Sequence, residues 1–262
     1  MCPPQLRSRS AGGRDRREPD ARALHVLTNG VRCCVHGRTV TCLVLGWREP
    51  ALWGSKGTYT RVAYDHLPRL DSARHDGSFA WLEEAREVYG LQYGLDDEDA
   101  PDDDVIAGKL AAITKLARRE KLDVPRSFTH LLSRRELYGR IPSCTACYIE
   151  LPDQLAVLPG QPGRFLRFMN DQQCCFVWGL HLVPGVAPTV VIAVPVFGEA
   201  NGDTLEAVAT FTEPEICASD FEELIHRFWL ENTLWFALQE GRPLSTEEAA
   251  YVAAAQEARL WT

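Results

Sequence analysis

The sequence of 262 residues lacks a long apolar run, since the most apolar stretches are short or are interrupted by charge. A membrane-spanning helix needs about 18 apolar residues, so no membrane partner is expected. The first 22 residues contain six arginines and no apolar stretch, which argues against a secretory signal. Residues 1–22 are therefore predicted to be a disordered Arg-rich tail.

An excess of positive charge is also lacking. The chain has 28 Lys and Arg against 36 Asp and Glu, a net charge of −8. This balance disfavours non-specific nucleic-acid binding and suits a basic protein partner. The sequence contains no Gly-rich phosphate loop, no His-Glu-x-x-His and no Gly-x-Ser-x-Gly. We therefore expect no enzymatic activity and no cofactor.

The nine cysteines form an odd set without an export signal, which predicts reduced thiols in the cytoplasm. Cys144 and Cys147 have the Cys-x-x-Cys spacing of a redox pair or of half a zinc site. They precede a predicted strand and lack two further ligands, so buried structural thiols are favoured and no metal is expected. The alternative function is a Cys–His hydrolase or transferase built from Cys147 or Cys175 with His181.

Composition divides the chain into three parts. Residues 23–76 are an unassigned extension with short strands predicted at 38–45 and 58–64. Residues 77–262 form the main domain. The acidic run at 96–104 within that domain is interpreted as a solvated linker that leads into a helix.

Two kinds of periodicity occur in the main domain. Helical spacing predicts helices over 78–90 and 105–121 and a short helix after Pro125. Apolar runs predict strands, joined by connections too short for crossover helices, at 145–151, 165–168, 174–182, 188–194 and 205–211. The run at 188–194 is the most apolar and is expected to be central.

Capping-box patterns at 219–222 and 245–248 predict two closing helices, the first with a wide apolar stripe. His226 is interpreted as a surface ion-pair partner of Glu222 and Glu223 on that helix. The fold class is predicted to be α+β, an antiparallel or mixed sheet of about five to six strands with helices packed on it.

Residues from Leu122 to about Val194 resemble the SUKH superfamily, which includes the Smi/Knr cell-wall-assembly regulator and bacterial immunity proteins. Leu122-Asp123-Val124-Pro125-Arg126-Ser127-Phe128 is similar to its Pro-started helix element. The second matching segment, in which a polar turn leads into a Trp-containing strand, is Arg167-Phe168-Met169-Asn170-Asp171-Gln172-Gln173-Cys174-Cys175-Phe176-Val177-Trp178.

The resemblance implies an intracellular, non-enzymatic protein-binding module, such as an immunity protein or antitoxin that binds and neutralises a basic toxin. An acidic inhibitor gains association rate by steering toward a basic partner. The residues proposed for partner binding are Asp171, Gln172 and Gln173 as a polar rim and Trp178 as an aromatic anchor. The favoured alternative is structural: the polar residues bond the backbone in a turn, and Trp178 lies in the core.

Overall fold

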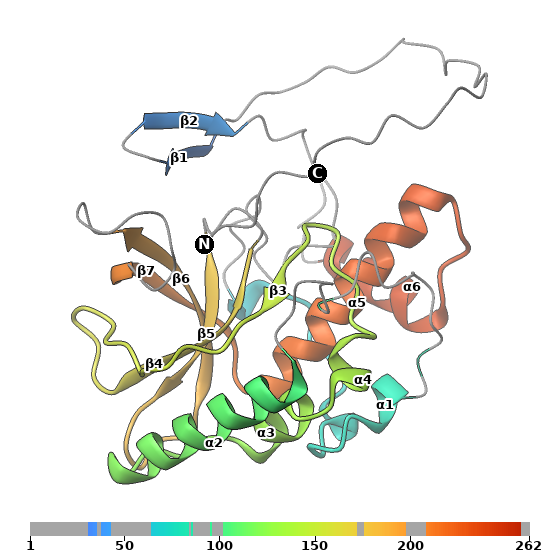
Figure 1. The fold of residues 1–262 in the computed structure, drawn as a ribbon. Coiled ribbons are helices and arrows are strands. Elements are labelled where there is room, and N and C mark those ends of the chain that lie inside the picture. The colour runs from blue at the N-terminus through green and yellow to red at the C-terminus, as the bar shows by residue number, and fades with distance from the viewer. Residues whose placement is uncertain are drawn as a thin grey trace, which may run out of the picture.

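The computed structural model describes residues 31–35, 38–42, 64–83, 85, 95, 102–171, 176–197 and 208–257 (Figure 1). The predicted tail and all but the last residue of the predicted strand at 58–64 lie outside these residues; Tyr64 begins a 3-10 turn. Strands β1 (Val31–Val35) and β2 (Arg38–Cys42) form an antiparallel hairpin within the predicted extension. None of the described helices has the length and apolar character that a membrane span requires.

The main sheet is an antiparallel meander in the order β3-β4-β5-β6-β7. Its strands are β3 (Tyr148–Ile149), β4 (Arg164–Asn170), β5 (Val177–Leu182), β6 (Thr189–Phe197) and β7 (Val208–Ala218). With the helices described below, it confirms the predicted α+β class. The expected central strand is β6, but the middle strand is β5, and β6 lies between β5 and β7.

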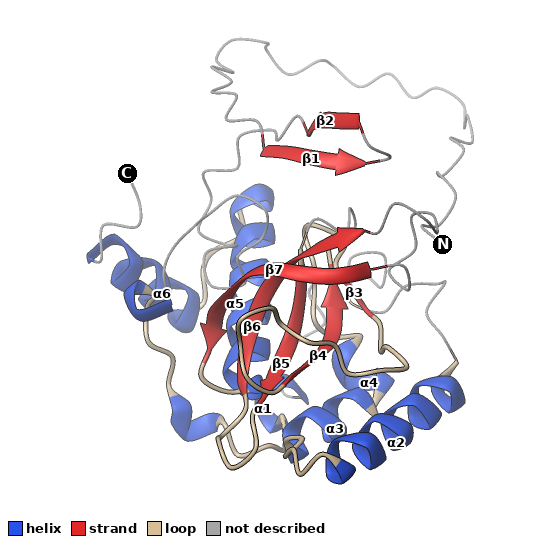
Figure 2. Cartoon of the chain, turned by 90° about the vertical axis from the view of Figure 1, so that its left-hand side faces the viewer, coloured by secondary structure: helices blue, strands red, loops and turns tan. Residues whose placement is uncertain are grey.

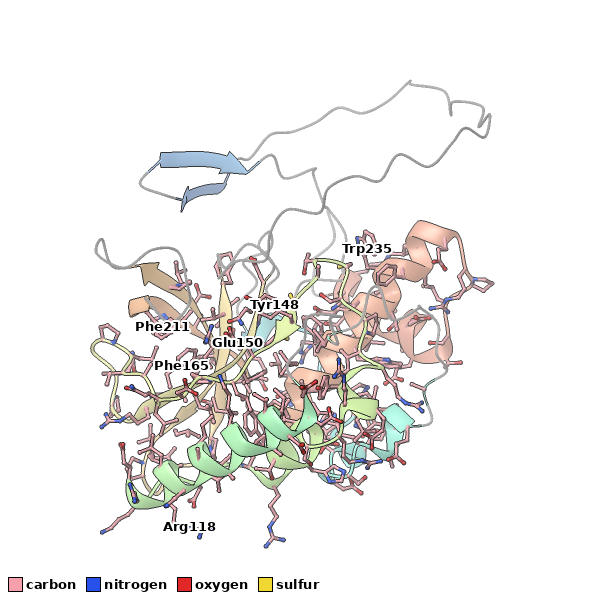
Figure 3. All side chains as sticks on the ribbon, in the orientation of Figure 1. Arg118, Tyr148, Glu150, Phe165, Phe211 and Trp235 are labelled. Carbon is pink, nitrogen blue, oxygen red and sulfur yellow. The ribbon has the colours of Figure 1, made fainter. Side chains whose placement is uncertain are left out.

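Helices cover one face of this sheet (Figure 2). They are α1 (Ala80–Glu83), α2 (Asp103–Arg119), α3 (Arg126–Leu132), α4 (Arg135–Tyr138) and α5 (Phe221–Glu240). The last helix, α6 (Thr246–Glu257), packs on α5 instead of on the sheet. Alternate strand side chains such as Leu180 and Ile192 join the first five helices in the main core. The strand side chains between these point to the opposite face of the sheet. There Phe165, Phe211 and others form a smaller apolar cluster (Figure 3).

The capping residues explain where the last two helices begin. Ser245 and Glu248 exchange bonds between side chain and backbone N–H, which is the predicted capping box of α6. For α5 the box is shifted by one residue from the prediction. Asp220 is the N-cap and accepts from the Glu223 N–H, while Glu223 accepts from the Ser219 N–H.

Residues 64–76, part of the unassigned extension, pack against the two closing helices. Leu67 shares a buried apolar cluster with Leu230, Leu234 and Tyr251. The 3-10 turn over Tyr64–His66 begins this segment, and Tyr64 Oη donates to Glu223 at 2.7 Å. The folded body therefore includes residues on the N-terminal side of position 77.

Candidate partner-binding groove

A groove of about 1090 Å³ lies between α2, α3 and the loop at 76–78. It opens to solvent and has a mixed surface of small apolar, hydroxyl and basic side chains with one carboxylate, that of Asp76. Its lining residues are Asp76, Gly77, Ser78, Ala107, Leu110, Ala111, Thr114, Lys115, Arg118, Arg126, Thr129, His130 and Ser133. In α2 and in α3 the lining positions recur at three- and four-residue spacing, so each helix presents one face to the groove.

A tight turn brings the two helices together. α2 ends at Arg119, and Lys121 just beyond it has a left-handed φ of 57°, a conformation that usually favours glycine. The Leu122 N–H donates back to the Ala117 carbonyl at 2.9 Å. Pro125 then precedes the first turn of α3. The chain thus reverses within a few residues, which places Arg118 and Arg126 at the same end of the groove.

This part of the molecule is basic although the whole chain is acidic. Residues 105–140 contain nine Lys and Arg and only three Asp and Glu. Several of these cations are neutralised, since Lys109, Arg134 and Arg135 pair with Asp153, Glu83 and Asp103.

Three groove cations differ from the neutralised ones. Among the described residues, none forms an ion pair with Lys115, Arg118 or Arg126, and all three side chains are exposed. Figure 3 shows Arg118 at the lower edge of the molecule, pointing away from the sheet. Within the described part of the chain, one end of the groove therefore carries positive charge that no carboxylate pairs with.

The third wall, residues 76–78, is attached to α5 through a buried carboxylate. Glu222 is 3% exposed and accepts from the Gly77 N–H at 2.6 Å and from Trp81 Nε1 at 3.1 Å. Gly77 has φ +84°, and a Cβ there would lie 3.8 Å from Ser127 Cβ of α3. The left-handed backbone conformation of Gly77 thus allows the loop at 76–78 to pass between α5 and α3.

Behind this wall lies a chain of polar side chains that links three segments. His75 Nε2 is 2.9 Å from His226 Nδ1, and His226 Nε2 is 2.9 Å from Glu247 Oε1. Arg74 closes the chain by donating to both Glu247 oxygens at 3.0 Å. His226 is 0% exposed, so its interpretation as a surface partner of Glu222 and Glu223 is wrong.

Burial changes the ionisation of this cluster. The hydrogen bond from His226 holds the pKa of Glu247 below its usual range. Burial lowers the pKa of His75, and the charge on His226 adds to that effect. Glu247 is therefore a carboxylate near neutral pH, and His75 favours its neutral form.

A second buried network fixes α6 on α5. Arg227 is 1% exposed and donates to the Pro68 carbonyl, to Tyr251 Oη and to Glu223. Tyr251 Oη donates to Glu231 at 2.5 Å, and burial raises the pKa of this phenol well above its usual value. The predicted apolar stripe of α5 thus also buries charged side chains, each held by a partner.

Two of the residues predicted to bind a partner lie elsewhere: Asp171 directly follows β4, and Trp178 is in β5. Trp178 is 0% exposed and packs edge-on to Phe228 with ring centroids 6.4 Å apart, which is the placement of the structural alternative. Asp171 is 6% exposed, and its N–H donates to the Phe176 carbonyl at 3.1 Å. Gln172 and Gln173 lie outside the described residues. The core position of Trp178 leaves no indole face open to a partner.

The structure separates Cys147 from His181, the first of the two candidate Cys–His pairs. Cys147 is 2% exposed, and burial raises the pKa of its thiol to about 12. Tyr148, the neighbour of Cys147, pairs with Asn170 at one end of β4, whereas His181 pairs with Phe165 near the other end. Asn170 and Phe165 are about 16 Å apart along the strand. Cys175 lies outside the described residues. Within the described part of the chain, no three His, Cys, Asp or Glu side chains gather into a metal site.

Comparisons with family models, with curated proteins and with solved structures give no match. The SUKH resemblance therefore stays a prediction.

Sequence reasoning did not identify the groove or the His75–His226 contact. Lys115 and Arg118, together with Arg119 and Lys121, were interpreted only as favourable charge at the C-terminal end of a helix, and Arg126 was given no role. What distinguishes the three groove cations is their lack of counter-ions in the described structure, which only tertiary contacts show.

Proposed function

We propose that the chain is a non-enzymatic protein-binding module that holds an acidic segment of its partner in the groove between α2 and α3. The observation that carries this proposal is the set of three exposed cations, Lys115, Arg118 and Arg126, without a described counter-ion at one end of that groove. Lys109, further along α2, is by contrast paired with Asp153. Carboxylates of a partner would neutralise these three cations.

The chemistry of the rest of the groove fits a polypeptide. Ala107 and Ala111 provide a shallow apolar floor, and the hydroxyls of Thr114, Thr129 and Ser133 can bond a peptide backbone or side chain. An acidic segment with small or apolar residues between its carboxylates would use both kinds of contact. This composition distinguishes the occupant from a free inorganic anion, which needs no apolar floor.

The SUKH resemblance supplies the finer part of the proposal. Its bacterial members neutralise toxins by direct binding, so we propose the role of an immunity protein or antitoxin in the cytoplasm. The expectation of a basic toxin came from the net charge of −8. The groove adds that the part of the partner that enters it is acidic, whatever the net charge of the whole partner.

A matched pair of charge reversals on α2 tests the proposal. Arg118 lines the groove, whereas its neighbour Arg119 is equally exposed and does not. We expect Arg118→Glu to weaken binding of a fluorescein-labelled oligoaspartate peptide by on the order of tenfold, and Arg119→Glu by less than about twofold. Fluorescence anisotropy measures both dissociation constants. Equal losses in the two variants would overturn the groove assignment, as would the absence of binding to the wild-type protein.

The same pair identifies the natural partner. A protein from host lysate that wild type and Arg119→Glu capture, and Arg118→Glu does not, supports the proposal. Capture of the same protein by wild type and by Arg118→Glu in equal amounts contradicts the proposal. Binding that appears only when the chain's own Asp96–Asp99 are changed to amides would instead make that acidic run the occupant.

A further inference from the structure

We propose that the His75–His226 pair is a pH-sensitive clamp on the 76–78 wall of the groove, so that proton uptake weakens docking of the acidic segment. The part that concerns binding rests on the proposed function. The part that concerns the wall can be measured on the protein alone.

Glu247, at one end of this series of side chains, determines which atom donates in each hydrogen bond of the cluster. Glu247 is a carboxylate held by Arg74 and can only accept, so His226 Nε2 carries the hydrogen that lies between them. With the hydrogen of His226 on Nε2, its Nδ1 is the acceptor, and His75 Nε2 donates to it at 2.9 Å. Each side chain of the series thus fixes the tautomer of the next.

This series ends next to the groove. His75 is followed directly by Asp76, Gly77 and Ser78, which are the groove's third wall. The wall has one further anchor to α5, the 2.6 Å bond from the Gly77 N–H to Glu222. Release of His75 from His226 would therefore loosen one of two adjacent attachments.

The groups around the His75–His226 pair determine whether proton uptake favours or disfavours the contact. The aromatic rings of Trp81 and Trp229 lie 4.6 and 6.1 Å from the His226 ring and limit its access to water. His75 lines a second cavity of about 340 Å³. The charged and titratable groups around the pair and this cavity are Tyr64, Asp65, Arg69, Arg74, Asp220, Glu222, Glu223, Arg227 and Glu247.

Burial and the charge on His226 lower the pKa of His75, and together they outweigh Asp220, Glu222 and Glu223, which raise it. The clamped form therefore binds protons less readily than a released, solvated His75. As pH falls, protons bind preferentially to the released form, and the equilibrium shifts toward it. Proton linkage at a single site changes an equilibrium constant by at most about tenfold per pH unit.

A further imidazole, that of His130, lines the groove itself and can contact the peptide without involving the clamp. The binding measurement is therefore made in the His130→Gln background. His75→Gln is the matched test variant, because a glutamine amide can still donate to His226 Nδ1 but does not titrate.

The experiment combines amide exchange with peptide binding at about pH 8 and about pH 5.5. In peptide-free protein, we expect the protection factor of the Gly77 amide to fall at least about threefold at the lower pH, and to be constant in His75→Gln. In His130→Gln, we expect the dissociation constant for oligoaspartate to rise by a similar factor. That rise should vanish in His75→Gln/His130→Gln.

The outcomes separate the two proposals. A Gly77 protection factor that is the same at both pH values, in wild type and in His75→Gln, overturns the clamp. A pH-dependent protection factor in a protein that binds no peptide keeps the clamp and overturns the proposed function. Peptide binding in His130→Gln that is independent of pH overturns the coupling between clamp and groove, while docking itself stands.

Discussion

His75 and His226 lie 151 positions apart in the sequence, yet Nε2 of the first is 2.9 Å from Nδ1 of the second. The contact joins the segment that precedes α1 to the buried side of α5. Because His226 is also bound to Glu247 of α6, one imidazole ring holds three segments in register. The stability of this junction depends on the protonation of His75.

The first prediction concerns global stability against pH. The pKa of His75 is lowered on folding, so the unfolded chain binds this proton more readily than the folded protein does. The stabilisation is complete above the ordinary histidine pKa of 6.5 and is lost as pH falls through that value toward the folded pKa. Urea unfolding at a series of pH values should show wild type losing more stability than His75→Gln in that window. Parallel pH curves for the two proteins would contradict the prediction.

The second prediction concerns Trp178, the residue first proposed as a partner anchor. Its side chain is 0% exposed against Phe228, so Trp178→Ala should cost about 3–5 kcal/mol of unfolding free energy. Val157 is 55% exposed, and Val157→Ala should change that free energy by less than about 0.5 kcal/mol. Both values come from urea denaturation. A Trp178→Ala protein of wild-type stability would show that the indole is not a core residue.

The third prediction uses two glycines as a matched pair. A Cβ at Gly179 of β5 would lie 2.3 Å from Phe165 Cε2 and 2.7 Å from the Leu166 carbonyl oxygen, whereas a Cβ at Gly108 of α2 meets nothing within 4 Å. Gly179→Ala should therefore destabilise the protein by about 1–3 kcal/mol. Gly108→Ala should stabilise it by about 0.4–1 kcal/mol, because alanine favours the helix. Thermal unfolding ranks the two variants, and the reverse order would contradict the packing of β4 on β5.

The fourth prediction concerns thiol reactivity. The thiolate is the reactive form, and burial both raises the pKa of Cys147 to about 12 and removes it from solvent. In native protein near neutral pH, iodoacetamide should modify Cys144, which is partly exposed, well before Cys147. Peptide mass spectrometry after timed quenching distinguishes the two sites. Rapid labelling of Cys147 would restore the hypothesis of a Cys–His centre.

Local sequence patterns predicted most of the helical and strand framework. α2 was expected over 105–121 and spans Asp103–Arg119, because its apolar spacing and terminal charges are local properties. The capping box of Ser245 and Glu248 was likewise read from four adjacent residues. Strand ends were less accurate, since β3 is limited by its pairing with β4 and covers only Tyr148–Ile149.

The candidate site could not be predicted in the same way. His226 was assigned to Glu222 and Glu223 because those residues are its neighbours on the helix, but its true partners come from distant segments. Lys115 and Arg118 were interpreted as ordinary charges at the C-terminal end of a helix, and Arg126 was not singled out. Their functional signal is the absence of a neutralising carboxylate among the described residues, which depends on how α2, α3 and the 76–78 loop pack.

The central claim is that the groove between α2 and α3 receives an acidic segment. Titration of ¹⁵N-labelled protein with oligoaspartate, followed by amide chemical shifts, tests it most directly. The account predicts saturable shifts at Thr114, Arg118 and Thr129, which line the groove, and little change at Asp171 in the β4–β5 turn. Shifts centred on Asp171, with the groove amides unchanged, would contradict it.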